Sequence, residues 1–256
     1  MTSAHDNMLE WTKKVSERIR EITKPLAEII GPGSELRRLA EALPAVAARF
    51  QSMSRVVRDA CVHAGLPPCR FLSVEAWKEI ESAQHNGGND AAAAAAYRVS
   101  KAAIEDTETR EGMLNDWRAN SIVRTRIDIL EQALKAHDLQ LYSVSIPPFL
   151  AHIEGIIADR KHPPDETRNP QFHELKAYVR QLAAEDDLMG VFVSDFVANT
   201  VFEKFERGVE RPSFSRHAIL HGFDTAYGSE VNSVKAILIF DYLQDLVMDD
   251  LRATTE

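Results

Sequence analysis

An arginine and two histidines stand within six residues of one another, at Arg216, His217 and His221. On a helix, His217 and His221 lie one turn apart and share a face, and Arg216 lies about 100° around the axis from His217. Histidine can donate or accept a proton near neutral pH, and arginine grips a phosphate with two parallel hydrogen bonds. The group therefore contains the acid, the base and the cation that cleavage of RNA by its own 2′-hydroxyl requires.

Metal binding is an alternative chemistry for two histidines four residues apart. The zinc-protease pattern needs a glutamate directly after the first histidine, where this chain has Ala218, and Asp224 is the only carboxylate close by that could add a ligand. Elsewhere, Cys61, His63 and Cys69 have a spacing that matches no zinc pattern. We therefore expect neither a metal nor another cofactor.

A structural role is the second alternative for the same side chains. Arg216 and His217 could hydrogen-bond to buried carbonyls, or they could pair with Asp224 or Glu230. Three further polar residues follow the motif, and we expect them to order the loop there, with Glu230 or Asn232 capping the final helix. These supporting residues are Tyr227, Glu230 and Asn232.

The surroundings of the motif are similar to a known family. The residues that carry the likeness are the R-x4-H motif Arg216–His221, Gly222, Tyr227-Gly228, Asn232 and Asp241-Tyr242-Leu243. An upstream stretch, residues 126–157, adds the strings Ile-Leu-Glu-Gln-Ala-Leu and Ser-Ile-Pro-Pro. Together they resemble bacterial HEPN-like proteins of the HEPN ribonuclease superfamily, over residues 115–250.

The resemblance implies a helical bundle that dimerises, so that the motifs of two subunits meet in one cleft. It further implies a metal-independent endoribonuclease acting on RNA, with a 2′,3′-cyclic phosphate and a 5′-hydroxyl as product ends. His221 would be the catalytic acid or base, Arg216 would bind and stabilise the scissile phosphate, and His217 would orient or assist.

Such domains often act as toxins or in phage defence, which makes an antitoxin or a defence protein a candidate partner beside the RNA substrate. Other members of the superfamily are inactive scaffolds. The alternative is therefore a non-catalytic HEPN-like module that serves helical interaction or nucleotide binding.

Apolar residues recur at three- and four-residue steps along the chain, and no segment shows the alternation of a strand, so we expect an all-α fold. The expected helices cover residues 8–30, 34–57 with a kink at Pro44, 74–83, a helix after Asp90 that includes residues 91–96, 107–138, 145–157, 170–182, 184–208, a short helix ending at 221–222, and 230–251. We expect helices of unknown function over residues 1–108 and the HEPN-like domain over 109–256.

Three local signals refine this scheme. The sequence His-Asn-Gly-Gly-Asn at residues 85–89 predicts a loop. An apolar stripe that runs to Leu134 predicts one helix from Thr107 to about His137-Asp138. Ser145 is expected to cap the next helix, with Pro147-Pro148 in its first turn.

The formal net charge of −9 argues against extended coating of DNA or RNA, and we expect no DNA partner. Residues 201–221 carry four basic and three acidic side chains, which suits a small phosphate site on an acidic body. We expect the polar side chains of the helices before this segment to lie on solvated faces. They are His152, Glu154, His173 and Glu174.

Two cysteines give no disulfide framework and favour a reducing compartment. No apolar run approaches the roughly 20 residues that a membrane helix needs, and the first ten residues do not have the pattern of a signal peptide. We therefore expect a cytoplasmic protein without a membrane partner.

Overall fold

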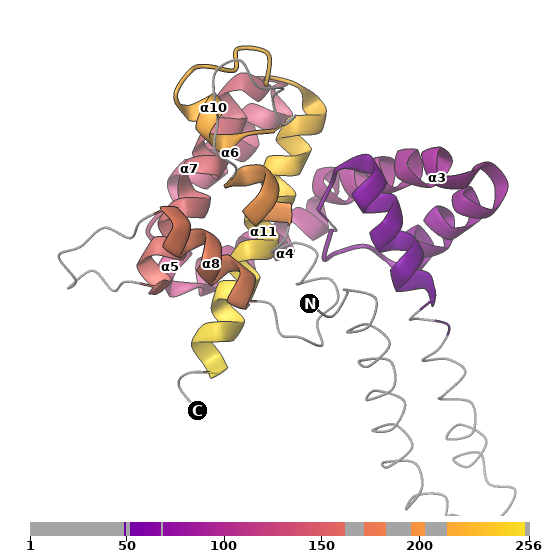
Figure 1. Cartoon of the computed structure of the whole chain (residues 1–256), viewed down its shortest axis with the longest axis horizontal. Coiled ribbons are helices and arrows are strands. Elements are labelled where there is room, and N and C mark those ends of the chain that lie inside the picture. The colour runs from indigo at the N-terminus through magenta and orange to yellow at the C-terminus, as the bar shows by residue number, and fades with distance from the viewer. Residues whose placement is uncertain are drawn as a thin grey trace, which may run out of the picture.

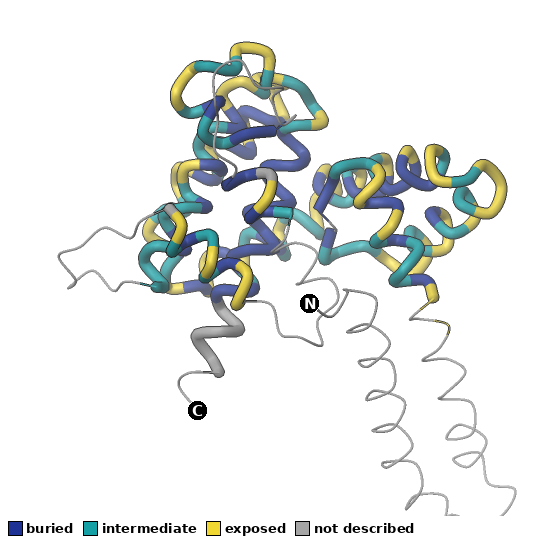
Figure 2. Tube along the Cα trace, in the orientation of Figure 1, coloured by how far each residue is buried: buried dark blue, intermediate teal, exposed yellow. Residues whose placement is uncertain are grey.

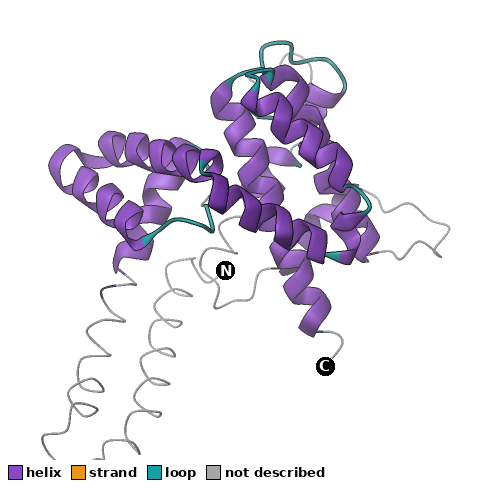
Figure 3. Cartoon of the chain, turned by 180° about the vertical axis from the view of Figure 1, so that it is seen from behind, coloured by secondary structure: helices purple, strands orange, loops and turns teal. Residues whose placement is uncertain are grey.

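The structure, a computed structural model, describes residues 49, 52–67, 69–161, 172–182, 196–202 and 214–253. Within these ranges every regular element is helical, and there is no strand (Figure 3). The prediction of an all-α helical bundle is confirmed. The helix expected over residues 8–30, and much of those expected over 34–57 and 184–208, lie outside the described residues.

A small helical layer precedes the bundle. It consists of a helix over residues 52–64 and of α3 (Val74–Glu105), whose two halves lie side by side (Figure 1). The chain reverses at Gly88, where φ is 69° and ψ is −160°. The loop predicted over residues 85–89 is therefore wrong in its extent, because one glycine at positive φ is enough to turn the chain.

Small side chains hold this layer together. The small buried alanines of the second half of α3 let its backbone approach the first half and the helix over residues 52–64, and the buried stretches of this layer are dark blue in Figure 2. The buried members of this core are Val57, Ala60, Cys61, Ile80, Ala92, Ala95, Ala96 and Val99. Leu66, Cys69 and Ile104 pack into the larger core of the bundle instead. The division expected at residue 108 stays a prediction.

The bundle is built around a central pair, α7 and α11, which lie against each other (Figure 1). Its elements are α4 (Thr107–Ala119), α5 (Ser121–Arg124), α6 (Ile127–Asp138), α7 (Tyr142–Lys161), α8 (Phe172–Leu182), the π-helical turn η1 (Val197–Val201), α10 (Arg216–Leu220) and α11 (Glu230–Ala253). α7 also contacts α6, α8 and α10. None of the helices that the structure describes has both the length and the apolarity to cross a membrane.

The single helix expected from Thr107 to about His137-Asp138 is three helices, the last of which ends at Asp138. Asn120 takes up an extended conformation with ψ at 113°, and its side-chain oxygen accepts a hydrogen bond from the Ile122 amide at 3.0 Å. Its amide nitrogen donates to the Gln244 carbonyl at 3.0 Å. Asn120 is fully buried, so these hydrogen bonds replace the hydration that its side chain loses. They also stabilise the extended backbone that separates α4 from α5.

Ser145 does not cap α7, contrary to the sequence prediction. The helix begins earlier, because the Ser145 amide donates to the Leu141 carbonyl at 3.0 Å. The Ser145 side chain is buried and accepts a hydrogen bond from the Ser233 hydroxyl at 3.1 Å, and the ring of His137 lies 2.8 Å from that hydroxyl. Pro147 and Pro148 stand inside the helix.

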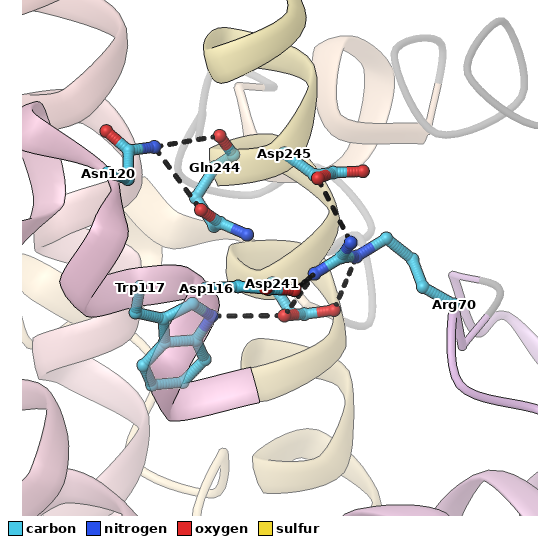
Figure 4. A network of polar contacts seen from close by, with 7 residues as sticks. All are labelled: Arg70, Asp116, Trp117, Asn120, Asp241, Gln244 and Asp245. Atoms are coloured by element: carbon cyan, nitrogen blue, oxygen red, sulfur yellow. Dashed lines mark hydrogen bonds and ion pairs between the residues drawn. The ribbon is translucent and has the colours of Figure 1, made fainter. Parts of the chain in front are cut away.

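One buried carboxylate joins the small layer to the bundle (Figure 4). Asp241, in the middle of α11, accepts hydrogen bonds from Arg70 Nε at 2.9 Å, Arg70 Nη2 at 3.0 Å and Trp117 Nε1 at 3.0 Å. Arg70 also pairs with Asp245 at 3.0 Å and Asp116 at 3.3 Å. Burial raises the pKa of the Asp241 carboxyl, and the hydrogen bonds from Arg70 and Trp117 act in the opposite direction.

Removing Arg70 should therefore destabilise the whole fold. We expect Arg70→Ala to lower the free energy of unfolding by about 3–5 kcal/mol, because it leaves the Asp241 charge buried without a cation. Denaturant unfolding followed by circular dichroism measures the change. The matched control is Arg98→Ala, whose ion pair with Glu79 is exposed and whose loss should cost less than about 1 kcal/mol.

The pH dependence of the stability of Arg70→Ala tests whether the buried Asp241 carboxylate causes the loss. Without Arg70, the buried Asp241 carboxyl should hold its proton in the folded chain at pH values where the unfolded chain has lost it. The stability of Arg70→Ala should then fall as the pH rises through that raised pKa. Equal destabilisation by the two arginine substitutions would contradict this account.

Candidate functional site

The predicted motif forms the short helix α10 and its C-terminal turn, at one end of the bundle (Figure 1). Ser215 caps the helix by accepting a hydrogen bond from the Ala218 amide at 3.3 Å. The helix ends as the sequence predicts, at His221 and Gly222, where φ is 72°. The amide of Phe223 then donates back to the Ala218 carbonyl at 2.8 Å, which is the usual closure after a glycine of positive φ.

The aromatic side chains of the motif form a small group. The rings of His217 and His221 lie 4.4 Å apart between centroids, at 46° to each other. Phe223 lies 6.3 Å from each of them. His221 is exposed and His217 is partly buried, so the group opens to solvent on the side of His221.

Arg216 is held by α7. Its Nη2 forms an ion pair with Glu154 Oε2, and its Nε donates to the Leu150 carbonyl at 3.3 Å. Only 16% of the Arg216 side chain is exposed, and the Glu154 Oε2 atom is buried. The solvated position predicted for Glu154 holds only in part, because its side chain is 34% exposed but pairs with Arg216. The anion beside Arg216 is Glu154 rather than Asp224 or Glu230.

Burial and neighbouring charge determine the protonation states. Burial, the ring of His221 and the charge of Arg216 together lower the pKa of His217, so this ring is neutral at pH 7. Burial also lowers the pKa of the Arg216 guanidinium, which nevertheless stays cationic near neutrality because arginine starts so high. The site thus combines a neutral imidazole, a fixed cation and an exposed second imidazole.

Tyr227 and Asn232 order the loop behind the motif. Pro147 has no amide hydrogen for the carbonyl one turn back, and the Tyr227 hydroxyl donates to that carbonyl, on Ser143, at 2.9 Å. Asn232 Nδ2 donates to the Tyr227 carbonyl at 2.9 Å. The cap of α11 is the hydroxyl of Ser229, which accepts from the Asn232 amide at 3.3 Å. The cap predicted at Glu230 or Asn232 is therefore wrong, by one residue or by three.

Glu230 belongs to a different group of side chains. It accepts hydrogen bonds from the hydroxyls of Tyr97 at 2.7 Å and Tyr142 at 3.3 Å, and it pairs with Lys101 at 3.0 Å. Hydrogen bonds from Tyr97 and Lys101 lower the pKa of Glu230. This carboxylate therefore joins α11 to α3, and no contact brings it to Arg216 or His221 in the described part of the chain.

The cysteines show no sign of chemical activation. Cys61 and Cys69 are buried free thiols, and burial raises the pKa of each to about 12. His63 is exposed and lies 2.7 Å from Asp90. Among the residues that the structure describes, no three histidine, cysteine or acidic side chains are grouped so that they could hold a metal ion.

Sequence reasoning missed two residues of the site, Glu154 and Phe223. Phe223 follows His221 by two positions, and a short helix ended by glycine is a local signal that its ring folds back. Glu154 has no such signal, because it meets Arg216 only when α7 and α10 pack together.

Comparison of the chain with protein-family models, with curated proteins and with solved structures found no match. The likeness to HEPN ribonucleases stays a prediction that rests on the motif and the residues around it.

The contact between Tyr227 and the carbonyl freed by Pro147 can be measured in a double-mutant cycle. Tyr227→Phe should lower the free energy of unfolding by about 1 kcal/mol, the net value of one hydrogen bond. Pro147→Ala restores an amide that can donate to Ser143, so Tyr227→Phe should cost much less in that background. The same cost in both backgrounds would show that the hydroxyl does not replace the missing donor.

Proposed function

We propose that this chain is a metal-independent endoribonuclease whose site is formed by Arg216, His217 and His221. The observation that carries the proposal is that a capped, glycine-terminated helix presents two imidazole rings 4.4 Å apart, one of them exposed. Helical spacing alone brings the three side chains to one end of the bundle. The likeness of the surrounding sequence to HEPN ribonucleases supports the same chemistry.

The proposed roles follow from charge and access. His221, the exposed ring, exchanges a proton with the RNA 2′-hydroxyl or with the leaving oxygen. Arg216 carries the fixed positive charge that stabilises the pentacoordinate phosphorane. His217 is neutral at pH 7 and packs against His221, so it orients that ring.

The spacing of the rings supports a site completed by a second copy of the chain. An acid and a base that act on one phosphate stand on opposite sides of it, each at a hydrogen-bond distance of about 2.8 Å. Two rings with centroids 4.4 Å apart leave no room for a phosphate between them. One chain therefore supplies one proton-transfer group, and the other comes from the motif of the partner in a homodimer.

A non-catalytic helical module is the second candidate, and one observation favours it. Arg216 already has an anionic partner in Glu154 and a carbonyl partner in Leu150, as a purely structural arginine would. Under this proposal α10 serves packing, and the exposed His221 has no catalytic role. The toxin or defence role, with its antitoxin or other partner and a cytoplasmic location, belongs to the catalytic proposal.

His221→Ala should abolish RNA cleavage without changing the fold, because the exposed ring contributes little to packing. We expect at least a thousandfold loss of rate when labelled RNAs of varied sequence are incubated with the purified protein in EDTA. The fragments should carry 2′,3′-cyclic phosphate and 5′-hydroxyl ends. His173→Ala, another exposed histidine, should cleave as the wild type does.

Expression in growing cells extends the test. Wild-type protein should slow growth, and His221→Ala should relieve the effect at equal protein level. A wild-type dimer that leaves all RNAs intact would contradict the catalytic proposal and favour the helical module.

A further inference from the structure

The proposed reaction needs the positive charge of Arg216 for a phosphate, but in this structure Arg216 is already paired with Glu154. A guanidinium recognises carboxylate and phosphate with the same parallel N–H donors, so the two anions compete for one position. Glu154 lies on α7 and Arg216 on α10, so the contact is made by the packing of the two helices and not by neighbouring residues.

The two side chains differ in their freedom to move. Arg216 keeps 16% of its side chain exposed and is also bound through Nε to the Leu150 carbonyl. Glu154 keeps 34% of its side chain exposed, and its Oε2, the atom that pairs with Arg216, has no further hydrogen-bond partner among the described residues. Rotation of Glu154 toward solvent would free the terminal nitrogens of Arg216, whereas the Nε bond would keep the guanidinium in place.

We propose that Glu154 occupies the position of a substrate phosphate, holds Arg216 in its absence, and is displaced when an RNA phosphodiester binds. The inference rests on the proposed function and deepens it, because it names the residue that sets the affinity of the site for RNA. Arg216 is then never left as a half-buried cation without an anion, either before or after RNA binds.

The test measures binding in the absence of cleavage. A fluorescein-labelled oligonucleotide with 2′-O-methyl groups has no 2′-hydroxyl to attack the phosphate, so the full-length protein can bind it but cannot cleave it. Fluorescence anisotropy should show that Glu154→Gln binds this probe about tenfold more tightly than the wild type. The glutamine keeps the shape of the side chain and removes the competing charge.

Two controls separate displacement from a general change of charge. Glu131→Gln removes one negative charge from an exposed pair with Arg118, and it should change the affinity less than twofold. In an Arg216→Ala background, Glu154→Gln should give no gain, because the guanidinium for which the two anions compete is gone. A gain equal to that of Glu131→Gln, or one that persists without Arg216, overturns the inference.

A second variant, Glu154→Asp, tests the inference if Glu154→Gln fails to fold. Glu154→Asp keeps the charge but draws it back by one methylene, so it should also bind the probe more tightly, by a smaller factor. Thermal unfolding identifies the variants that fold. Unchanged affinity in the folded variants at position 154 overturns the inference.

The outcomes for the inference and for the proposed function are distinct. Tighter binding by Glu154→Gln together with no cleavage by the wild type would support the exchange of anions and contradict the ribonuclease. Cleavage that depends on His221, together with no effect of position 154 on binding, would support the ribonuclease and contradict the exchange.

Discussion

The buried carboxylate of Asp241 is the constraint on which the arrangement of the helices depends. A charge with 2% of its side chain exposed is stable only if cations and donors surround it, and here they come from distant parts of the chain. Arg70 lies in the connection between the helix over residues 52–64 and α3, and Trp117 lies on α4. Because Trp117 also packs edge-on against Phe149 and Phe240, at 6.1 and 5.1 Å between centroids, the polar contact fixes the centre of the apolar core. α7 and α11 meet at that centre.

The candidate site depends on α7 in turn, although its motif lies on α10. α7 supplies the Leu150 carbonyl and the Glu154 carboxylate to Arg216, and near its start it supplies the Ser143 carbonyl to Tyr227. The Ser143 carbonyl is available because Pro147 cannot donate to it. The loop after the motif also comes close to the same residue, since a side chain at Gly228 would lie 3.0 Å from the Ser143 Cβ. One helix therefore positions both the cation and the loop behind the imidazoles.

The sequence predicted the features that local chemistry determines. Ser215 and Gly222 delimit α10 by capping and by positive φ, and the dense apolar run after Ser229 predicted α11. The wrong predictions concern residues whose conformation depends on a contact with a residue far away in the sequence. The break at Asn120 depends on Gln244, which is 124 residues away, and the burial of Ser145 depends on Ser233, which is 88 residues away. The pairing of Glu154 with Arg216 was missed for the same reason, because nothing near Glu154 in sequence indicates that Arg216 packs beside it.

Arg216 faces two requirements that oppose each other. A guanidinium with most of its surface buried needs an anion for the fold to be stable, and a ribonuclease needs the same guanidinium for a phosphate. A permanent anion on the same helix would stabilise the buried guanidinium but would keep a phosphate from binding it. A carboxylate on another helix, one third exposed, stabilises the guanidinium and can move away when a phosphate binds. The catalytic and non-catalytic proposals therefore differ in one property of one contact, which is whether Glu154 yields its position to a stronger anion.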